Sequence, residues 1–518
     1  MKKYIKAKDV KDLFSGLSEF SLIDIREIGQ HTNGHPFFSI SIPFSVFESK
    51  IVELVPCKET LIILMDNNDG LSEIVKEIAL EIGYKNIQIL KNGVFGWEKS
   101  GYYLFKGIHV PSKAFGELVE LKKHTPHIKP SELRKKIKQN DNIIIIDGRP
   151  IDEFKKMNIP FGICCPNMEV PIRIGKEIDD KTEIIVNCAG RTRSIIGAQN
   201  LINFGIKNKV RALENGTQGW TLSGYKLEHN KTRSLDLDEI KSDQVKYHES
   251  ASKIIKNFNL KKINLKKMNF FLQDKTKNTF VFNITANKKF SENKLHLRNA
   301  PGGQLIQSTD SFIGVFNCKV ILIDDGDLLR SALTASWLKQ MGYDVYIFED
   351  DSNYLKNFFD QKKEFIIPKA KVIGNSDLKK NLKLNLLDIR TSNEFKEANI
   401  KRTKWINRVN LRSANFNKNK DFLLIYSDLV KAELIYKDIT SKYKTSVYFY
   451  KFDKDFVLSH DLCSKKGAFI KKENRIDFIY HTYKRHLGNK SHSRAYLSWE
   501  KGLLDHMDDQ EKNRFKIL

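Results

Sequence analysis

No segment of this 518-residue sequence approaches the roughly 20 consecutive apolar residues that a membrane-spanning helix needs. The N-terminal stretch from Met1 to Val10 contains basic residues but lacks the apolar run of a signal peptide. Apolar residues still make up 41% of the chain, which is sufficient for ordinary cores, and the length suits about four domains. We therefore expect a cytoplasmic protein of several domains without membrane contact.

Cysteine is scarce as well, and the six cysteines lack the spacing of a metal site or of a disulfide framework. Cys57, Cys318 and Cys463 are isolated in separate parts of the chain, and Cys164 and Cys165 are adjacent rather than arranged as Cys-x-x-Cys. We predict small buried side chains in a reducing compartment, and neither a metal ion nor another cofactor. A role for Cys164 or Cys165 as a resolving thiol stays open.

Acidic residues are also under-represented, with 63 Asp and Glu against 88 Lys and Arg, for a net charge of +25. Such a surplus is one mark of nucleic-acid binding. The lysines are spread among many asparagines and isoleucines, however, and the densest patch, Lys253 to Lys267, alternates with apolar residues at helical intervals. We predict amphipathic helices there, no nucleic-acid partner, and a basic surface that gathers small anions.

The most informative residue that is present is Cys188, in the stretch from Glu183 to Ser194. An apolar run ends at this cysteine and is followed at once by Gly190, two arginines and a helical pattern. A strand that enters a tight loop and then a helix directs backbone N–H groups into one small anion-binding bowl. We therefore expect Cys188 to ionise readily and to act as a nucleophile.

The frame around Cys188 occurs four times in the chain. Each unit has an apolar run that ends in a polar anchor, and these anchors are Asp24, Asp147, Asn283 and Asp388. A second apolar run follows at a nearly constant distance of 42, 41, 42 and 39 residues, and its exit is marked by Asp66, Cys188, Asp325 and Ser427. Internal repetition of this kind predicts tandem domains, of which only the second carries the cysteine.

Each unit alternates strands, loops and helices, which is typical of a small α/β domain with a mostly parallel sheet. Units one and two share a third mark, Asn-Gly-x-x-Gly-Trp, which ends at Trp97 and at Trp220. In open α/β sheets the functional site lies at the carboxyl ends of the strands. The exit of the second run, where Cys188 lies, is such a place.

Asp-x-Arg, a Cys-x4-Arg loop that opens a helix, and Asn-Gly-x-x-Gly-Trp together resemble the rhodanese domain, and the resemblance covers most of the chain. More closely, the sequence is similar to bacterial proteins with four tandem rhodanese-like domains and a helical C-terminal extension, in which only the second domain keeps the cysteine. Phosphatases related to rhodanese use Cys-x5-Arg, whereas Cys188 and Arg193 form Cys-x4-Arg. The spacing therefore favours the rhodanese type.

The resemblance implies a thiosulfate sulfurtransferase. In such enzymes the cysteine thiolate attacks the sulfane sulfur of a small anionic donor such as thiosulfate, releases sulfite and holds the sulfur as a persulfide. A thiol or cyanide acceptor then removes it, and a protein acceptor stays an open alternative. The loop around the nucleophile is predicted to bind the donor through Ala189, Gly190, Arg191, Thr192, Arg193 and Ser194. One departure is that Arg191 occupies a place where the family commonly has glycine.

Several neighbours of the loop have a structural and a functional interpretation. For Asp147 and Arg149 we favour a scaffold role, since ion-pair networks also perturb charged groups. Trp220 is predicted to pack on the core, with a place at the edge of the pocket as the alternative. Glu169 and Arg173 are within possible reach of the pocket mouth, but we favour solvated charges.

The domain boundaries follow the points where the repeat pattern loosens. We predict a first domain without cysteine, the catalytic domain, two further domains without cysteine of which the last is diverged, and a helical extension: 1–107, 126–230, 257–352, 367–461 and 474–518. In the extension, Tyr496, Trp499 and Leu503 share one helix face. Three histidines there lie five and six residues apart and so are predicted to be surface residues rather than metal ligands: His481, His486 and His492.

A second hypothesis is that the chain is a binding scaffold of rhodanese-like folds in which Cys188 serves only as a sulfur relay or redox sensor. The units without cysteine would then recognise a partner. Because inactive units more often orient or cover an active neighbour than act alone, we expect unit one or unit three to pack near the Cys188 loop.

Overall fold

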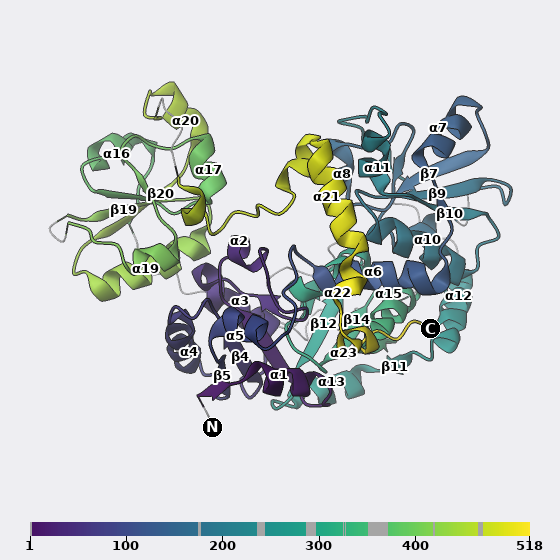
Figure 1. The fold of residues 1–518 in the computed structure, drawn as a ribbon, viewed down its shortest axis with the longest axis horizontal. Helices are drawn as coiled ribbons and strands as arrows, with labels where there is room; N and C mark the ends of the chain where they lie inside the picture. Colours follow the sequence, from purple (N-terminus) through teal and green to yellow (C-terminus); the bar gives the residue numbers. More distant parts are fainter. Residues whose placement is uncertain are drawn as a thin grey trace.

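The computed structural model describes residues 3–174, 178–235, 244–285, 297–324, 326, 328–350, 371–417, 420–464 and 470–518. Within these residues the chain forms four five-stranded parallel sheets, each flanked by helices (Figure 1). The strand order is the same in every unit, with the first strand at one edge and the third at the other. The prediction of tandem α/β domains followed by a helical extension is therefore confirmed.

Units one and two are joined by the long helix α6 (Val110–Lys123). Unit one comprises β1 (Tyr4–Ile5), α1 (Ala7–Phe14), β2 (Phe20–Asp24), α2 (Ile28–His31), β3 (Ile40–Ser41), α3 (Phe47–Leu54), β4 (Leu61–Met65), α4 (Leu71–Glu81), β5 (Ile87–Leu90) and α5 (Gly93–Lys99). Unit two comprises β6 (His127–Ile128), α7 (Pro130–Lys138), β7 (Ile143–Asp147), α8 (Ile151–Lys156), β8 (Ile163–Cys164), α9 (Val170–Ile174), β9 (Glu183–Asn187), α10 (Thr192–Phe204), β10 (Val210–Leu213) and α11 (Gly216–Leu222).

Helix α12 (Gln244–Asn257) leads into unit three. Unit three comprises β11 (Lys261–Ile263), α13 (Leu265–Gln273), β12 (Thr279–Asn283), β13 (Leu297–Asn299), α14 (Gly302–Gln307), β14 (Lys319–Ile323), α15 (Leu329–Gln340) and β15 (Asp344–Phe348). Unit four comprises β16 (Lys371–Val372), α16 (Asn375–Leu378), β17 (Asn385–Asp388), α17 (Ser392–Glu397), β18 (Lys404–Trp405), α18 (Arg408–Leu411), β19 (Phe422–Tyr426), α19 (Leu429–Lys442), β20 (Val447–Lys451) and α20 (Lys454–Ser459).

The polar anchors of the repeat end the central strands and hold the loops that follow. Asp147 accepts two hydrogen bonds from the guanidinium of Arg149, at 2.8 and 2.7 Å, and one from the Asn187 side chain at 2.9 Å. Asp24 with Arg26 and Asp388 with Arg390 repeat this arrangement. In unit three, neutral Asn283 accepts from the Thr285 hydroxyl instead, at 2.9 Å. The anchors are therefore structural groups of the loop.

The pairing register corrects two of the predicted site positions. In unit two, Asn187 pairs with the anchor, and Cys188 is the next residue. In the other units, the residue that follows the partner of the anchor is Asp66, Asp324 or Tyr426. The predicted Asp325 and Ser427 each lie one residue too far along the chain, and Asp325 is outside the described residues. The prediction was wrong because the end of an apolar run does not define the pairing register of the strand.

Units one, two and three share one continuous apolar core, to which α6 and the end of the chain contribute. Unit four has apolar clusters of its own and forms a separate lobe, at the left of Figure 1. Arg408 joins this lobe to unit one, because its guanidinium donates to the Glu48 carboxylate at 2.6 and 2.7 Å and to the Phe44 carbonyl at 3.1 Å. Three units thus make one body, and the fourth is attached to its side.

The C-terminal extension returns from unit four to the body. It contains α21 (Lys490–Lys501), α22 (Leu503–His506) and α23 (Asp509–Asn513), preceded by a short 3-10 helix over Tyr483–Leu487. Helix α21 packs against α6 and α11, and α22 packs against α6. The helical pattern predicted for this segment is confirmed, and its path brings it against unit two.

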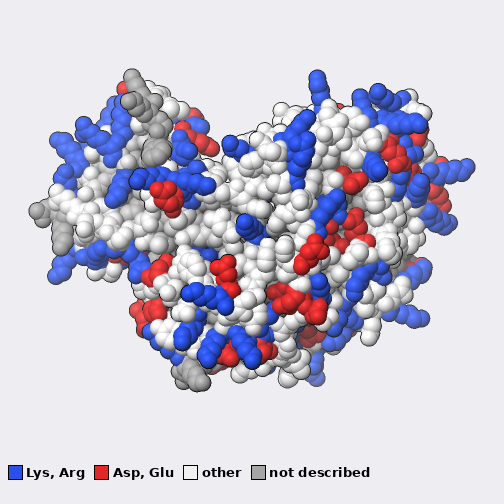
Figure 2. All heavy atoms as spheres, in the orientation of Figure 1, with Lys and Arg blue, Asp and Glu red and all other residues white. Residues whose placement is uncertain are grey.

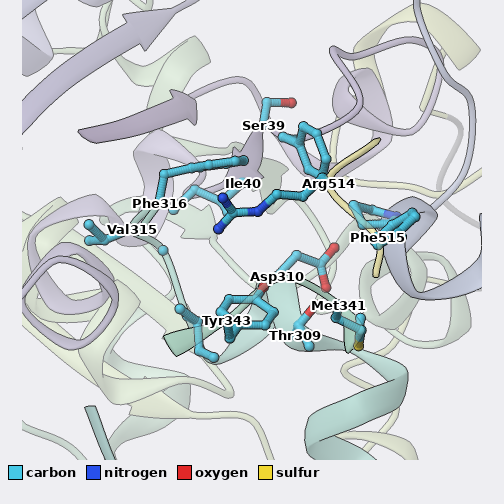
Figure 3. A pocket seen from close by; sticks show the side chains of 14 residues that line it. Ser39, Ile40, Thr309, Asp310, Val315, Phe316, Met341, Tyr343, Arg514 and Phe515 are labelled. Carbon is cyan, nitrogen blue, oxygen red and sulfur yellow. The ribbon is translucent and has the colours of Figure 1, made fainter. Parts of the chain in front are cut away.

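The last residues of the chain fill a gap between units one and three, where a small cavity of about 40 Å³ remains (Figure 3). Arg514 enters this gap, donates to the Asn317 side chain at 2.8 Å and lies over the Phe316 ring at 5.1 Å. Because a water molecule occupies about 30 Å³, the cavity has room for one water. It is a packing gap rather than a substrate site.

Charge on the surface is mixed. On the face drawn in Figure 2, Lys and Arg side chains occur over both the unit-four lobe and the body, and Asp and Glu are interspersed among them. No helix in the described part of the chain combines the length and apolar character that crossing a membrane requires.

Candidate active site

Cys188 lies at the carboxyl end of β9, where a buried strand meets the loop that opens helix α10. Its side chain is almost fully enclosed, with 2% of the residue exposed. The sulfur lies 3.5 Å from the Ser194 hydroxyl and 3.8 Å from the Arg191 carbonyl oxygen. At the start of α10 the N–H groups of Ser194 and Ile195 donate to the Arg191 carbonyl, at 3.0 and 3.1 Å, which closes the loop beside the sulfur. The predicted strand, loop and helix are all present.

Helix α11 packs against the loop that carries Cys188 and holds its backbone in position. Gly216 begins this helix with φ of +53°, and a Cβ at this position would lie 2.2 Å from the Cys188 carbonyl oxygen. Only glycine tolerates both the left-handed backbone and this approach. The N–H groups of Thr217 and Gln218 donate to the carbonyls of Cys188 and Ala189, at 2.8 and 3.2 Å. The glycine of the repeat motif is thus required to position the nucleophile loop.

Units one and three show what the equivalent loops bind. In unit one, the Asp66 carboxylate accepts from the backbone N–H groups of Asn68 and Ser72, both at 2.9 Å. In unit three, the Asp324 carboxylate accepts from two backbone N–H groups of its own loop, both at 3.0 Å. Each of these loops therefore holds an anion that the chain itself supplies. In unit two the sulfur of Cys188 stands where the other two loops have a carboxylate.

The two loop arginines are held by carboxylates. Arg191, in a helical backbone conformation that needs no glycine, donates to both oxygens of Glu117 at 2.7 Å and also pairs with Glu120. Arg193 donates to both oxygens of Glu153 at 2.8 Å. Both arginines line the cavity in front of Cys188, but most of their charge is balanced within the protein. The two arginines predicted to bind the donor therefore lie at the cavity, each paired with a carboxylate, and their contact with the donor stays a prediction.

The electrostatics of Arg193 confirm its closeness to the nucleophile. Burial lowers the pKa of its guanidinium, but the hydrogen bonds to Glu153 and the charges of Cys188 and Asp147 outweigh that effect and raise the pKa above its ordinary value. For Glu153, burial raises the pKa, but its hydrogen bonds with Arg193 lower it below the usual range. Both groups are therefore charged at neutral pH.

Glu117 offers a test of how burial and pairing balance beside the loop. Burial raises the pKa of Glu117 from its ordinary 4.5 to about 7, although Arg191 opposes the shift. The folded chain then keeps a proton that the unfolded chain loses, so the stability contributed by this proton disappears as pH rises through about 7. We expect Glu117→Gln, which mimics the protonated form, to gain stability relative to wild type as pH rises from 5 to 8, by up to about 3 kcal/mol.

Amide hydrogen exchange of α6, measured at both pH values, reports this difference locally. A stability difference between the two proteins that stays constant, or shifts in favour of wild type, from pH 5 to pH 8 would show that the ion pair with Arg191 outweighs burial.

A cavity of about 250 Å³ lies in front of the Cys188 loop. Unit two contributes the loop and Gln218, α6 contributes Lys113, and unit three contributes Gln307. Unit three therefore packs near the Cys188 loop, as expected, and reaches the cavity through Gln307. The opposite wall comes from the C-terminal extension and includes Tyr496 and Trp499. The two aromatic side chains of the predicted helix face thus line the cavity.

Glu500 fixes this wall to the nucleophile loop. It is completely buried, accepts a hydrogen bond from the Thr192 hydroxyl at 2.7 Å, and lies 3.5 Å from the Lys113 ammonium. Burial lowers the pKa of Lys113, but Tyr496 and Glu500 raise it above its ordinary value overall. Sequence reasoning missed Lys113, Glu117 and Glu500. No local motif marks them, because each acts across domains.

The remaining predicted residues lie away from the cavity. Trp220 is buried in the core of unit two and donates to the Lys226 carbonyl at 2.9 Å, so the alternative place at the pocket edge was wrong. Glu169 is buried and pairs with Arg330 of unit three at 2.8 Å and with Arg173 at 3.2 Å. Both the pocket mouth and the solvated state predicted for Glu169 and Arg173 are therefore corrected.

The predictions for the other cysteines of unit two and for the histidines of the C-terminal extension had different outcomes. Cys164 lies on β8, two strands away from Cys188 in the sheet, and burial raises its pKa to about 12. Burial also raises the pKa of Cys165, so both thiols are protonated at neutral pH, which argues against a resolving role for either. His481 lines the cavity rather than the surface, and burial with nearby Arg485 lowers its pKa to about 4. The side chain of His486 lies outside the described residues.

Comparison with known proteins agrees with this architecture. Residues 6–100 and 129–223 each match the model of the rhodanese-like domain. The crystal structure of a thiosulfate sulfurtransferase from Pseudomonas aeruginosa is similar over 100% of this chain and 99% of its own, with 28% identity and a TM-score of 0.87. A putative sulfur carrier protein, YrkF, from Bacillus subtilis (strain 168) is 28% identical over 96 residues, or 18% of this chain. The chain spans about half the length of that curated relative, 51%.

Proposed function

We propose that this chain, which belongs to the rhodanese-like family, is a sulfurtransferase that moves a sulfane sulfur from thiosulfate or a related donor through a persulfide on Cys188. The acceptor is a thiol or cyanide, and a protein thiol is an acceptor of the same chemistry. We assign catalysis to the second domain, residues 126–230. The similarity to a thiosulfate sulfurtransferase over the whole chain supports the proposed activity.

One observation carries the proposal. The loops of units one and three enclose their own Asp66 and Asp324 carboxylates, whereas the equivalent loop of unit two has Cys188 in that place and a cavity of about 250 Å³ in front of it. Backbone N–H groups that hold a carboxylate also hold a thiolate or the oxygens of a sulfur oxyanion. Among units one to three, unit two is the one whose loop lacks a carboxylate of its own at this position and faces the cavity.

The first half-reaction breaks the sulfur–sulfur bond of the donor. The Cys188 thiolate attacks the sulfane sulfur of thiosulfate, a new Sγ–S bond forms, and the bonding electron pair of the donor leaves with sulfite. The loop N–H groups and the nearby charge of Arg193 stabilise the negative charge that gathers on the leaving group.

The second half-reaction restores the enzyme. An acceptor thiolate or cyanide attacks the outer sulfur of the persulfide, the Sγ–S bond breaks, and its electron pair returns to Cys188. The product is an organic persulfide or thiocyanate. Because the donor product leaves before the acceptor reacts, the kinetics are ping-pong.

The state of the cysteines indicates the cellular compartment of the protein. All six are free thiols. A chain with free thiols and a reactive cysteine suits a reducing compartment, and we propose a cytoplasmic location on that ground.

Steady-state transfer from thiosulfate to cyanide, with intact-mass detection of the persulfide, tests the proposal. We expect turnover and a mass gain of one sulfur after incubation with thiosulfate alone. A mass gain without turnover would instead support the sulfur-relay hypothesis. A chain that neither gains sulfur nor turns over would contradict both.

A further inference from the structure

The cations around the Cys188 cavity differ in how their charge is balanced. Lys113, Arg191 and Arg193 each lie within ion-pair distance of a buried or half-buried carboxylate. Arg485, from the C-terminal extension, also lines the cavity. Among the residues that the structure describes, no carboxylate lies within 4.0 Å of its guanidinium. Arg485 therefore brings a positive charge to the cavity that the protein does not neutralise by direct pairing.

The guanidinium of Arg485 is held in position. Its Nη1 donates to the carbonyl and the hydroxyl oxygen of Thr482, at 3.1 and 3.0 Å, and its plane lies 4.3 Å from the centre of the Tyr496 ring. Burial lowers its pKa, while Tyr496 and Glu500 act in the opposite direction. A guanidinium is charged at all physiological pH values. A half-buried, oriented and unpaired guanidinium is a preorganised site for an anion.

The size and lining of the cavity indicate what kind of anion fits. At about 250 Å³, the cavity is larger than an engineered cavity of about 150 Å³ that binds benzene. Thiosulfate has only five non-hydrogen atoms, so it leaves part of the space unfilled. The wall beside Arg485 is formed by Tyr496 and Trp499, which offer apolar contact. A ligand that fills the cavity thus has a short carbon chain as well as a charge.

We infer that Arg485 is a specificity residue that binds the carboxylate of a small organic thiol, and that this thiol is the sulfur acceptor. The inference rests on the proposed function and adds the class of acceptor to it. The acceptor thiolate attacks the outer sulfur of the Cys188 persulfide, and the electron pair of the broken Sγ–S bond returns to Cys188. The organic persulfide then leaves with its carboxylate intact.

The kinetic test compares two acceptors that differ in one charge, 3-mercaptopropionate and 2-mercaptoethanol, with thiosulfate as the donor. In Arg485→Gln we expect KM for 3-mercaptopropionate to rise at least about tenfold, because a charge-assisted hydrogen bond is lost. KM for 2-mercaptoethanol and kcat should change less than twofold. Arg494→Gln is the matched control, since Arg494 is exposed on the same extension. Arg485→Lys, which keeps the charge, should recover part of the lost affinity.

A binding measurement keeps the inference testable without turnover. In Cys188→Ser, titration calorimetry should detect 3-mercaptopropionate, and adding Arg485→Gln should weaken that binding at least about tenfold. Equal effects on both thiols, or none on 3-mercaptopropionate, would overturn the assignment. If wild type shows no sulfur transfer but Cys188→Ser binds 3-mercaptopropionate through Arg485, the proposed function fails while the carboxylate site stands.

Discussion

Replacing Cys188 by serine is expected to lower kcat for sulfur transfer at least about 1000-fold, as loss of a covalent nucleophile does in other enzymes. A hydroxyl at this position keeps its proton at neutral pH and forms no stable bond to sulfur. The backbone loop would persist, because its hydrogen bonds run from the N–H groups of α11 to main-chain carbonyls. The mass gain of one sulfur, seen by intact mass spectrometry, should vanish with the activity.

Cys463→Ser is the matched control, since Cys463 lies in unit four and is a free, half-buried thiol. It should keep full activity and the same mass gain. The result that would count against the assignment is a persulfide in Cys188→Ser, mapped to Cys164 or Cys165. We do not expect it, because burial raises the pKa of both thiols and leaves them protonated at neutral pH.

The repeated frame and the place of the nucleophile could be predicted from sequence because both depend on local pattern. Apolar runs such as Ile143–Asp147 form buried parallel strands, and the glycine and helix after Cys188 define the loop within a few residues. The predicted Asp325 and Ser427 failed by one residue, because the end of an apolar run in the sequence does not define which residues pair in the sheet. Strand pairing aligns Asp324 and Tyr426 with Cys188.

The cavity wall could not be predicted in the same way. The pattern of Tyr496, Trp499 and Leu503 indicates a buried helix face, but it does not say which surface the face covers. Likewise, Arg191 was expected to face a substrate because it belongs to the loop that follows Cys188. Its partner Glu117 lies 74 residues away on the helix between units one and two. Such pairings depend on how domains pack, which no spacing within one unit encodes.

Glu500→Ala is expected to release the cavity wall from the nucleophile loop. The substitution removes the acceptor of the Thr192 hydroxyl and leaves Lys113 as a buried cation without its carboxylate. Breaking a buried pair in this way costs about 3 kcal/mol or more, which is roughly a 100-fold faster exchange of the α21 amides. We expect kcat/KM for thiosulfate to fall at least about tenfold, because Tyr496 and Trp499 move with the helix. Asp505→Ala, at an exposed carboxylate of α22, should change neither quantity.

A double variant separates the buried charge from the hydrogen bond. Lys113→Met combined with Glu500→Gln removes both charges but keeps an acceptor for Thr192. A neutral pair of similar volume avoids the cost of a lone buried charge. If the unpaired ammonium of Lys113 causes most of the lost protection in Glu500→Ala, the double variant should therefore recover most of the protection of the α21 amides. Protection as low as in Glu500→Ala would contradict this account and assign the stability to the ionic contact itself. Activity recovered together with protection would show that the extension acts on the reaction through the position of the wall.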